Sequence, residues 1–216
     1  MIHSKKKALL MMVCAVMLVL VSVMGTMAYL TSQDTVTNTF TVGKVAITLD
    51  EAKANADGSL FDQGATRVKA NNYKLLPGHT YAKDPMVTVL EGSENSYIKM
   101  TVTFTKAAEL DAIFAPAGAD MTSIFNGYDG SNWIAKDVTK DTVKNTRTYE
   151  FWYKEAVAAP SENVPLDALF DSIAVPGSIT NEQLATIEGM TITVNAYAIQ
   201  ADGFATPEAA WAAFHA

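Results

Sequence analysis

Residues Ser96–Phe104 read SYIKMTVTF. The apolar side chains Ile98, Met100, Val102 and Phe104 occur at every second position, and a period of two is that of a β-strand with one apolar face. This stretch therefore predicts a strand whose even-numbered side chains enter a core.

The same alternation recurs along the chain, whereas helical spacing is confined to short stretches. Short strands without regular strand–helix alternation indicate an all-β fold, and we expect an antiparallel, jelly-roll-like β-sandwich with short helical insertions. Asp50–Lys74 is polar and predicts a long surface connection, with Asp57-Gly58 as a turn signal, and Val164–Val175 predicts a helical turn followed by an extended piece. Further strands are expected at 86–90, 133–138, 147–154 and 190–200, and helices at 106–114, 180–187 and from Thr206.

An apolar leader precedes this region. Lys5, Lys6 and Lys7 are followed by an uninterrupted apolar run from Ala8 to Leu30, a pattern typical of an export signal. The run is longer than a plain signal core, so a cleaved signal peptide and an uncleaved membrane helix both remain open. We expect cleavage near Ala28, Tyr29 and Leu30, and hence a signal segment 1–30 followed by a β-sandwich domain 31–216.

Composition excludes several classes of protein. The formal net charge is −7 and becomes −10 without the three leader lysines, so a nucleic-acid partner is not expected. Cys14 is the only cysteine and lies in the leader, which leaves the exported part without disulfides, thiolate nucleophile or cysteine metal ligand. Membrane contact is expected through the leader alone.

Two further stretches carry a family resemblance. Gly25–Leu30 (GTMAYL) followed by Asn38–Val45 (NTFTVGKV) resembles the leader and mature start of TasA/camelysin-type secreted proteins, whose precursors are cut by a SipW-type signal peptidase. Leu76-Pro77-Gly78, Lys83-Asp84-Pro85 and the strand beginning at Tyr97 are similar to that family's Pro-Gly turn and next strands. The resemblance covers about the first hundred residues.

The resemblance implies a jelly-roll protein at the cell surface or in a biofilm matrix. It also implies self-association into fibres, in which the N-terminal strand of one subunit completes the sheet of the next. The matching segment alternates with period two, and Gly43 follows it as a joint. The same segment could instead be the first strand of its own sandwich, and both alternatives stay open. The expected assembly strand consists of Thr35, Val36, Thr37, Asn38, Thr39, Phe40, Thr41 and Val42.

Enzyme chemistry finds little support in the sequence. His79 and His215 are far apart and neither belongs to an H-E-x-x-H motif, so a camelysin-like metallopeptidase is an alternative without a recognisable zinc site. We expect no cofactor, no metal and no catalytic residue. The other alternative is a monomeric secreted sandwich that binds a polymer or a protein partner. Paired carboxylates for sugar hydrolysis (Glu91, Glu94, Asp167, Asp171) and an aromatic sugar platform around Trp152 are weaker alternatives.

Overall fold

The computed structural model describes the backbone of Ile2–Met27 and residues 43–114 and 125–214. The chain divides into two units, Met1–Val42 and Gly43–Ala216. The first contains helix α1 (Ile2–Met27). In the part of the chain whose side chains are described, no helix is long and apolar enough to cross a membrane. The expected assembly strand Thr35–Val42 and the expected cleavage residues lie outside the described residues.

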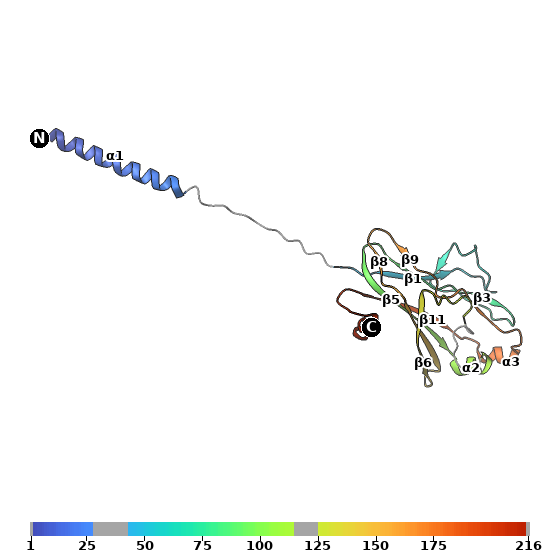
Figure 1. Cartoon of the computed structure of the whole chain (residues 1–216). Helices are drawn as coiled ribbons and strands as arrows, with labels where there is room; N and C mark the ends of the chain where they lie inside the picture. Colours follow the sequence, from blue (N-terminus) through green and yellow to red (C-terminus); the bar gives the residue numbers. More distant parts are fainter. Residues whose placement is uncertain (1, 28–42, 115–124, 215–216) are drawn as a thin grey trace. The chain divides into compact units, whose positions relative to one another are not determined.

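The second unit is built around a five-stranded antiparallel sheet (Figure 1). Its order is β11-β5-β7-β6, and β8 pairs with the first part of β5. Every strand predicted in this sheet is present, and β5 begins slightly before the predicted segment. The strands are β5 (Ser93–Thr105), β6 (Trp133–Asp141), β7 (Thr146–Tyr153), β8 (Val157–Ala159) and β11 (Ile192–Gln200).

Two smaller antiparallel sheets complete the strand set. One has the order β2-β1-β4-β9, and the other pairs β10 with β3. Because β4 and β5 lie in different sheets, the loop between them is a crossover rather than a hairpin. These strands are β1 (Ile47–Ala52), β2 (Arg67–Val68), β3 (Thr80–Ala82), β4 (Met86–Val89), β9 (Val164–Pro165) and β10 (Ser172–Ala174).

One hydrophobic core joins the sheets. It takes the even-numbered side chains of β5, as the alternation predicted, together with residues of β4, β7 and the segment before β10. At its centre Phe125 stacks on Phe170 with ring centroids 4.2 Å apart. The whole described core lies within Gly43–Ala216, so this unit has the interior that an independently folding domain requires. The all-β class is confirmed.

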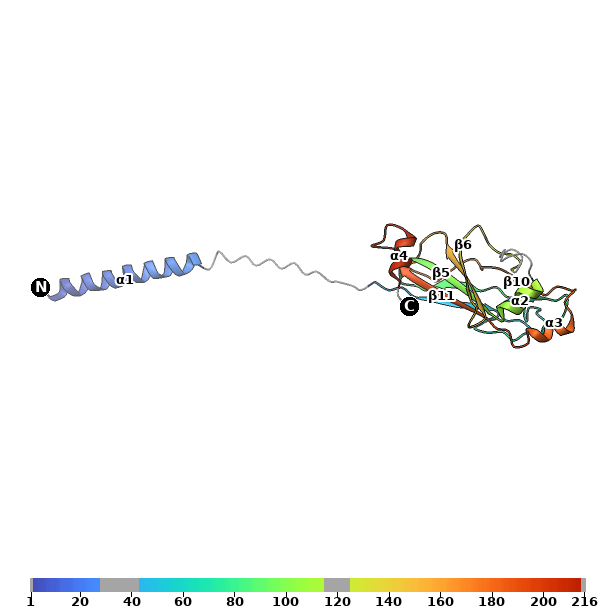
Figure 2. The same cartoon turned by 90° about the horizontal axis from the view of Figure 1, so that it is seen from below.

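Three short helices flank the sheets: α2 (Ala107–Phe114), α3 (Asn181–Thr186) and α4 (Pro207–Ala213). All three were predicted from the sequence. Thr180 caps α3 in a capping box with Gln183, and Thr206 caps α4 ahead of Pro207. α2 and α3 lie at one end of the domain and α4 lies at the other (Figures 1 and 2).

Two sequence predictions were wrong. Asp50–Lys74 is not only a surface connection, because β1 continues through buried Glu51 and Ala52 and β2 pairs with it. Val164–Val175 forms strands β9 and β10 and no helical turn, since its apolar side chains enter the core from an extended backbone. The Asp57-Gly58 turn is confirmed. Gly58 has φ +92°, and a Cβ there would lie 2.6 Å from the carbonyl oxygen of Thr80.

Candidate functional site

The described domain begins where the expected assembly strand ends. Lys44 forms a parallel bridge with Ser93, and the amide of Glu94 donates to the carbonyl of Lys44 at 2.8 Å. The Ser93 hydroxyl bonds both the amide and the carbonyl of Ala46 at 3.1 Å. Gly43 is exposed, and a Cβ at this position would approach Cγ of Glu94 to 3.1 Å. The chain therefore enters the domain beside the start of β5.

Strand β11 forms one outer edge of the large sheet. The amide of Thr105 donates to the carbonyl of Thr191, and the amide of Ala201 donates to the carbonyl of Asn95. Antiparallel pairs alternate, so between these anchors the odd-numbered residues of β11 bond β5 and the even-numbered ones point their amides and carbonyls outward. Within residues 43–114 and 125–214 no strand pairs with that outward side.

The core beneath this edge is incompletely covered. The side chains of Ile98 and Val102 on neighbouring β5 are 0% exposed. Their register partners on β11, Ala198 and Val194, pack against the same core but are only partly buried. The edge thus combines backbone groups that no described strand pairs with and apolar side chains that still contact solvent.

The first part of β1 provides a second edge nearby, which no described strand pairs on the side away from β4. β1 bonds β4 through its even-numbered residues, which leaves the backbone groups of Ile47 and Leu49 on the opposite side. The Lys69 ammonium donates to the carbonyl of Leu49 there. A groove of about 360 Å³ lies between β1, β2 and β11, and its lining includes Leu49, Asp50, Val68, Asn71, Ile192 and Val194.

The other outer edge of the large sheet, β6, is protected. The Tyr128 hydroxyl donates to the carbonyl of Trp133 at 2.6 Å, and the β6–β7 register shifts between Ala135 and Val138. Lysines at 136 and 140 follow along the strand. Bulges, edge lysines and capped backbone groups are devices that discourage strand addition. Of the two outer edges of the large sheet, β11 is therefore better suited than β6 to pair with an added strand.

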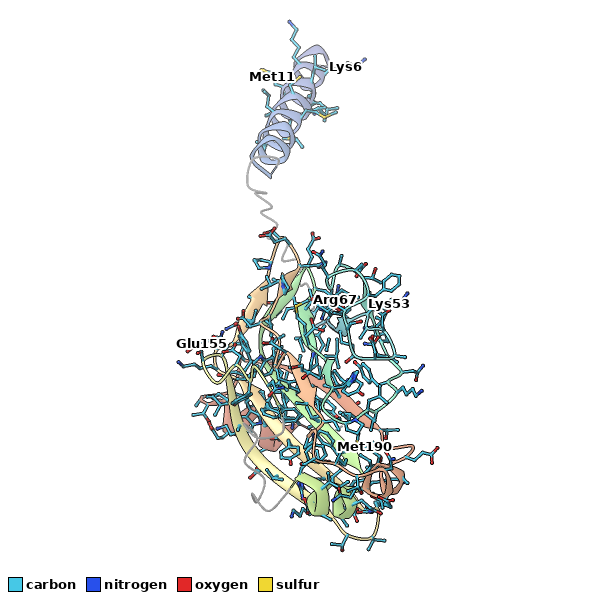
Figure 3. The ribbon with its side chains drawn as sticks, turned by 90° about the vertical axis from the view of Figure 1, so that its right-hand side faces the viewer. Lys6, Met11, Lys53, Arg67, Glu155 and Met190 are labelled. Carbon is cyan, nitrogen blue, oxygen red and sulfur yellow. The ribbon has the colours of Figure 1, made fainter. Side chains whose placement is uncertain are left out.

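A charged cluster fixes the wall of the groove. The Lys83 ammonium lies 2.6 Å from a carboxylate oxygen of Glu51, and both side chains are more than nine-tenths buried. Arg67, which is labelled in Figure 3, links β2 to Asp50 of β1 at 2.8 Å and also bonds Asp84. Sequence reasoning missed this cluster because its members lie in the stretch assigned to a surface connection and beside Pro85. Lys83-Asp84-Pro85, quoted for the family resemblance, was the signal that could have located it.

Of the residues considered for enzyme chemistry, His215 lies outside the described residues, and the contacts described for the others do not link them into one site. His79 is exposed, and its Nδ1 lies 3.4 Å from the carbonyl oxygen of Asp57. Asp167 accepts from Asn132 at 2.9 Å, and no hydrogen bond described in the structure joins any two of the four candidate carboxylates. No group of three or more metal-ligating side chains is present in the described part of the chain.

The aromatic residues of β7 are engaged by the protein itself. Tyr149 and Phe151 are buried in the core. Trp152 lies on the opposite face, where the Lys136 ammonium sits 4.2 Å from its ring centroid and the Trp211 ring is 6.1 Å away. Because Trp152 packs against Lys136 and Trp211, its ring does not form an open platform for a sugar.

Comparisons of this chain with protein-family models, with curated proteins and with solved structures found no match. The open edge of β11 and the groove beside it are therefore the basis for a functional proposal.

Proposed function

We propose that this chain is an exported cell-surface or matrix protein of TasA/camelysin type that assembles by strand addition. In this proposal Thr35–Val42 of one copy pairs with the outer edge of β11 in another copy and completes a jelly-roll sandwich. The observation that carries the proposal is the β11 edge, where outward-pointing backbone groups coincide with partly buried core side chains.

The lengths of the two strands agree. Thr35–Val42 has eight residues and β11 has nine. At about 3.3 Å per residue the added strand extends roughly 26 Å, which covers most of the edge. Backbone hydrogen bonds supply the affinity in this mode of recognition, and alternate side chains supply the specificity.

The groove beside β11 offers the strand both apolar and polar contacts. Val36, Phe40 and Val42 share one face of the segment, and Asn38 lies among them. Half of the residues that line the groove are polar or charged, and its larger aliphatic side chains are those of Leu49, Val68, Ile192 and Val194. In this proposal the apolar face of the added strand lies on these aliphatic side chains.

A matched pair of proline variants tests the proposal. The amide of Ala196 points away from β5, so Ala196→Pro blocks an added strand and leaves the β5–β11 hydrogen bonds in place. Val138→Pro is the control, because the same alternation points its amide outward from β6. We expect protein 31–216 and its Val138→Pro variant to form concentration-dependent assemblies, measured as native mass by light scattering.

We expect the Ala196→Pro variant and protein 43–216 to be monomeric. If protein 31–216 is monomeric at high concentration, the assembly proposal is wrong. The alternative hypothesis, a monomeric domain that binds a different partner, is then correct. If Ala196→Pro assembles as well as the parent protein, the β11 edge is not the acceptor.

A further inference from the structure

Lys83 carries a buried ammonium that has few partners. Its side chain is 8% exposed. An ammonium has three N–H donors, and among the described residues only Glu51 accepts a hydrogen bond from it, at 2.6 Å. The neighbouring Arg67 does not compete for Glu51, because it bonds Asp50 and Asp84. Burying two charges is costly, so a lysine with a single partner at this place needs a further explanation.

An amide side chain is held against the same carboxylate. Nδ2 of Asn71 donates to Oε1 of Glu51 at 3.0 Å, while the Lys83 ammonium donates to Oε2. The two nitrogens therefore occupy adjacent positions on one carboxylate group. The three side chains come from β1, from the segment that follows β2 and from the segment that follows β3, and all of them line the groove beside β11.

The backbone fixes the orientation of the Asn71 amide. Its Oδ1 accepts from the amide of Ala54 at 2.9 Å, and its Nδ2 also donates to the carbonyl of Ala52 at 2.9 Å. A backbone amide can only donate and a carbonyl can only accept, so the side-chain oxygen and nitrogen cannot be exchanged. The side-chain carbonyl of Asn71 is thus polarised by an N–H group, and its nitrogen faces Glu51.

This arrangement has the parts that an acyl transfer requires. An amine becomes a nucleophile when it loses a proton, and Glu51 is positioned to take that proton from Lys83. The transfer converts two buried charges into two neutral groups, which removes the desolvation cost of the ion pair. The Ala54 amide is positioned to stabilise the negative charge that develops on Oδ1 of Asn71 during attack at Cγ.

We propose that Lys83 and Asn71 form an intramolecular isopeptide bond. Nζ of Lys83 attacks Cγ of Asn71, a new C–N bond forms, and the bond between Cγ and Nδ2 breaks. The Lys83 ammonium loses two protons in all, and Glu51 passes both of them to Nδ2, which leaves as an ammonium ion. Nothing is oxidised or reduced, and no co-reactant is needed. The ion pair of Lys83 with Glu51 is the state before this reaction.

The bond ties the segment after β2 to the segment before β4. Both segments belong to the wall of the groove beside β11, so the link holds this wall together where hydrogen bonds alone could open. The reaction is separate from strand addition, because all three side chains belong to one chain and no second copy takes part.

The intact mass of denatured protein 31–216 tests the proposal, because the reaction releases one ammonia. We expect the parent protein to be lighter than its sequence by the mass of one ammonia. Asn71→Ala keeps the Lys83–Glu51 pair and removes the electrophile, so this variant should have the mass of its sequence. Asn72→Ala is the matched control and should keep the parent's mass deficit, since Asn72 is exposed and the structure describes no hydrogen bond between it and the cluster.

Glu51→Gln removes the group that carries the protons, so it should also have the mass of its sequence, with the Lys83 ammonium buried and unreacted. Asn71→Ala retains both charges of the pair and decides the case if Glu51→Gln fails to fold. A mass deficit that persists in folded Glu51→Gln would contradict the role of Glu51.

A tryptic digest locates the bond. It should contain a species that joins the peptide 70–74 to a peptide in which cleavage after Lys83 has failed. Ring closure at Asn126-Gly127 also releases ammonia, so the linked species is needed to assign the loss. The full sequence mass in folded parent protein, a deficit that persists in Asn71→Ala, or a loss that maps outside Asn71 and Lys83 would each overturn the proposal.

Discussion

At the scale of single residues, the buried pair Lys83–Glu51 is the most consequential electrostatic feature of the domain. Two opposite charges 2.6 Å apart are withdrawn from water, and Asn71 bonds the second carboxylate oxygen of Glu51 at 3.0 Å. Removing two charges from water is costly, so the pair stabilises the fold little more than an apolar pair of similar size would. Losing one partner, however, leaves a buried charge uncompensated and is strongly destabilising.

Glu51→Gln should therefore lower the free energy of unfolding by about 3–5 kcal/mol. Glu208→Gln is the control, because its partner Lys136 lies 3.2 Å away at the surface, where water screens the pair and the loss of one charge changes stability little. Urea denaturation of both variants measures the difference. Equal losses in the two variants would contradict the burial of the Lys83–Glu51 pair.

Titratable side chains predict stability losses at both extremes of pH. Hydrogen bonds hold the pKa of several exposed or partly buried carboxyl groups below the ordinary values of 3.8 for Asp and 4.5 for Glu. Their contribution is complete above the unfolded-state pKa and is lost as pH falls through the lower folded-state pKa. These groups are Asp57, Asp62, Glu109, Asp141, Glu182 and Glu208.

Burial acts in the opposite direction on the tyrosines. It raises the pKa of Tyr73, Tyr81, Tyr128 and Tyr153 above the ordinary value of 10.0. The neutral hydroxyl is favoured in the folded state, so stability is complete below pH 10 and falls as pH rises further. Chemical denaturation across pH should give a plateau with losses below about pH 4.5 and above about pH 10. A maximum at either extreme would contradict these shifts.

At the scale of elements, α4 is a short helix fastened to the outer face of the large sheet. Trp211 of α4 lies against Trp152, and the Lys99 ammonium of β5 sits 4.6 Å from the Trp211 ring centroid. The Thr206 hydroxyl accepts from the amide of Ala209 and begins the helix. Seven residues cannot form a stable helix alone, so this cap and the aromatic contacts are what keep α4 in place.

Thr206→Ala removes this cap and should destabilise the folded form of α4 by about 1 kcal/mol. The consequence is local, so amide exchange should accelerate at Ala209–Trp211 and stay unchanged in the centre of β5. Thr193→Ala, an exposed threonine of β11 that caps no helix, is the control. Unchanged exchange in α4 of the Thr206→Ala variant would show that the cap contributes nothing.

The same elements show which parts of the fold the sequence predicts. β5, β7 and β11 alternate cleanly, because one face of each contacts the core, and their positions follow from the period alone. β2, β9 and β10 are two or three residues long and carry no period. Their pairing depends on partners distant in sequence, such as Arg67 of β2 with Asp50, so local patterns could not reveal them.

The candidate site shows the same division. The alternation of Thr35–Val42 predicts a strand, and this segment lies outside the described residues. The place of β11 at the edge of the sheet was not recognisable, because nothing in its sequence distinguishes an edge strand from a central one. The cluster of Lys83, Glu51 and Asn71 also depends on residues brought together from three separate segments.

For the whole molecule, the proposed strand addition produces a directional polymer. A donor strand at the start of one domain and an acceptor edge on the next are different surfaces, so the contact is heterologous. Heterologous contacts that do not close into a ring produce open filaments. The central claim is therefore that Thr35–Val42 and the β11 edge of another copy recognise one another.

Amide exchange of protein 43–216 with and without a peptide of residues 35–42 tests this claim most directly. The peptide should slow exchange of the outward amides of Ile192, Val194, Ala196 and Ala198 and leave those of β6 unchanged. Unchanged exchange along β11, or the same amides already protected in monomeric protein 31–216, would contradict the claim.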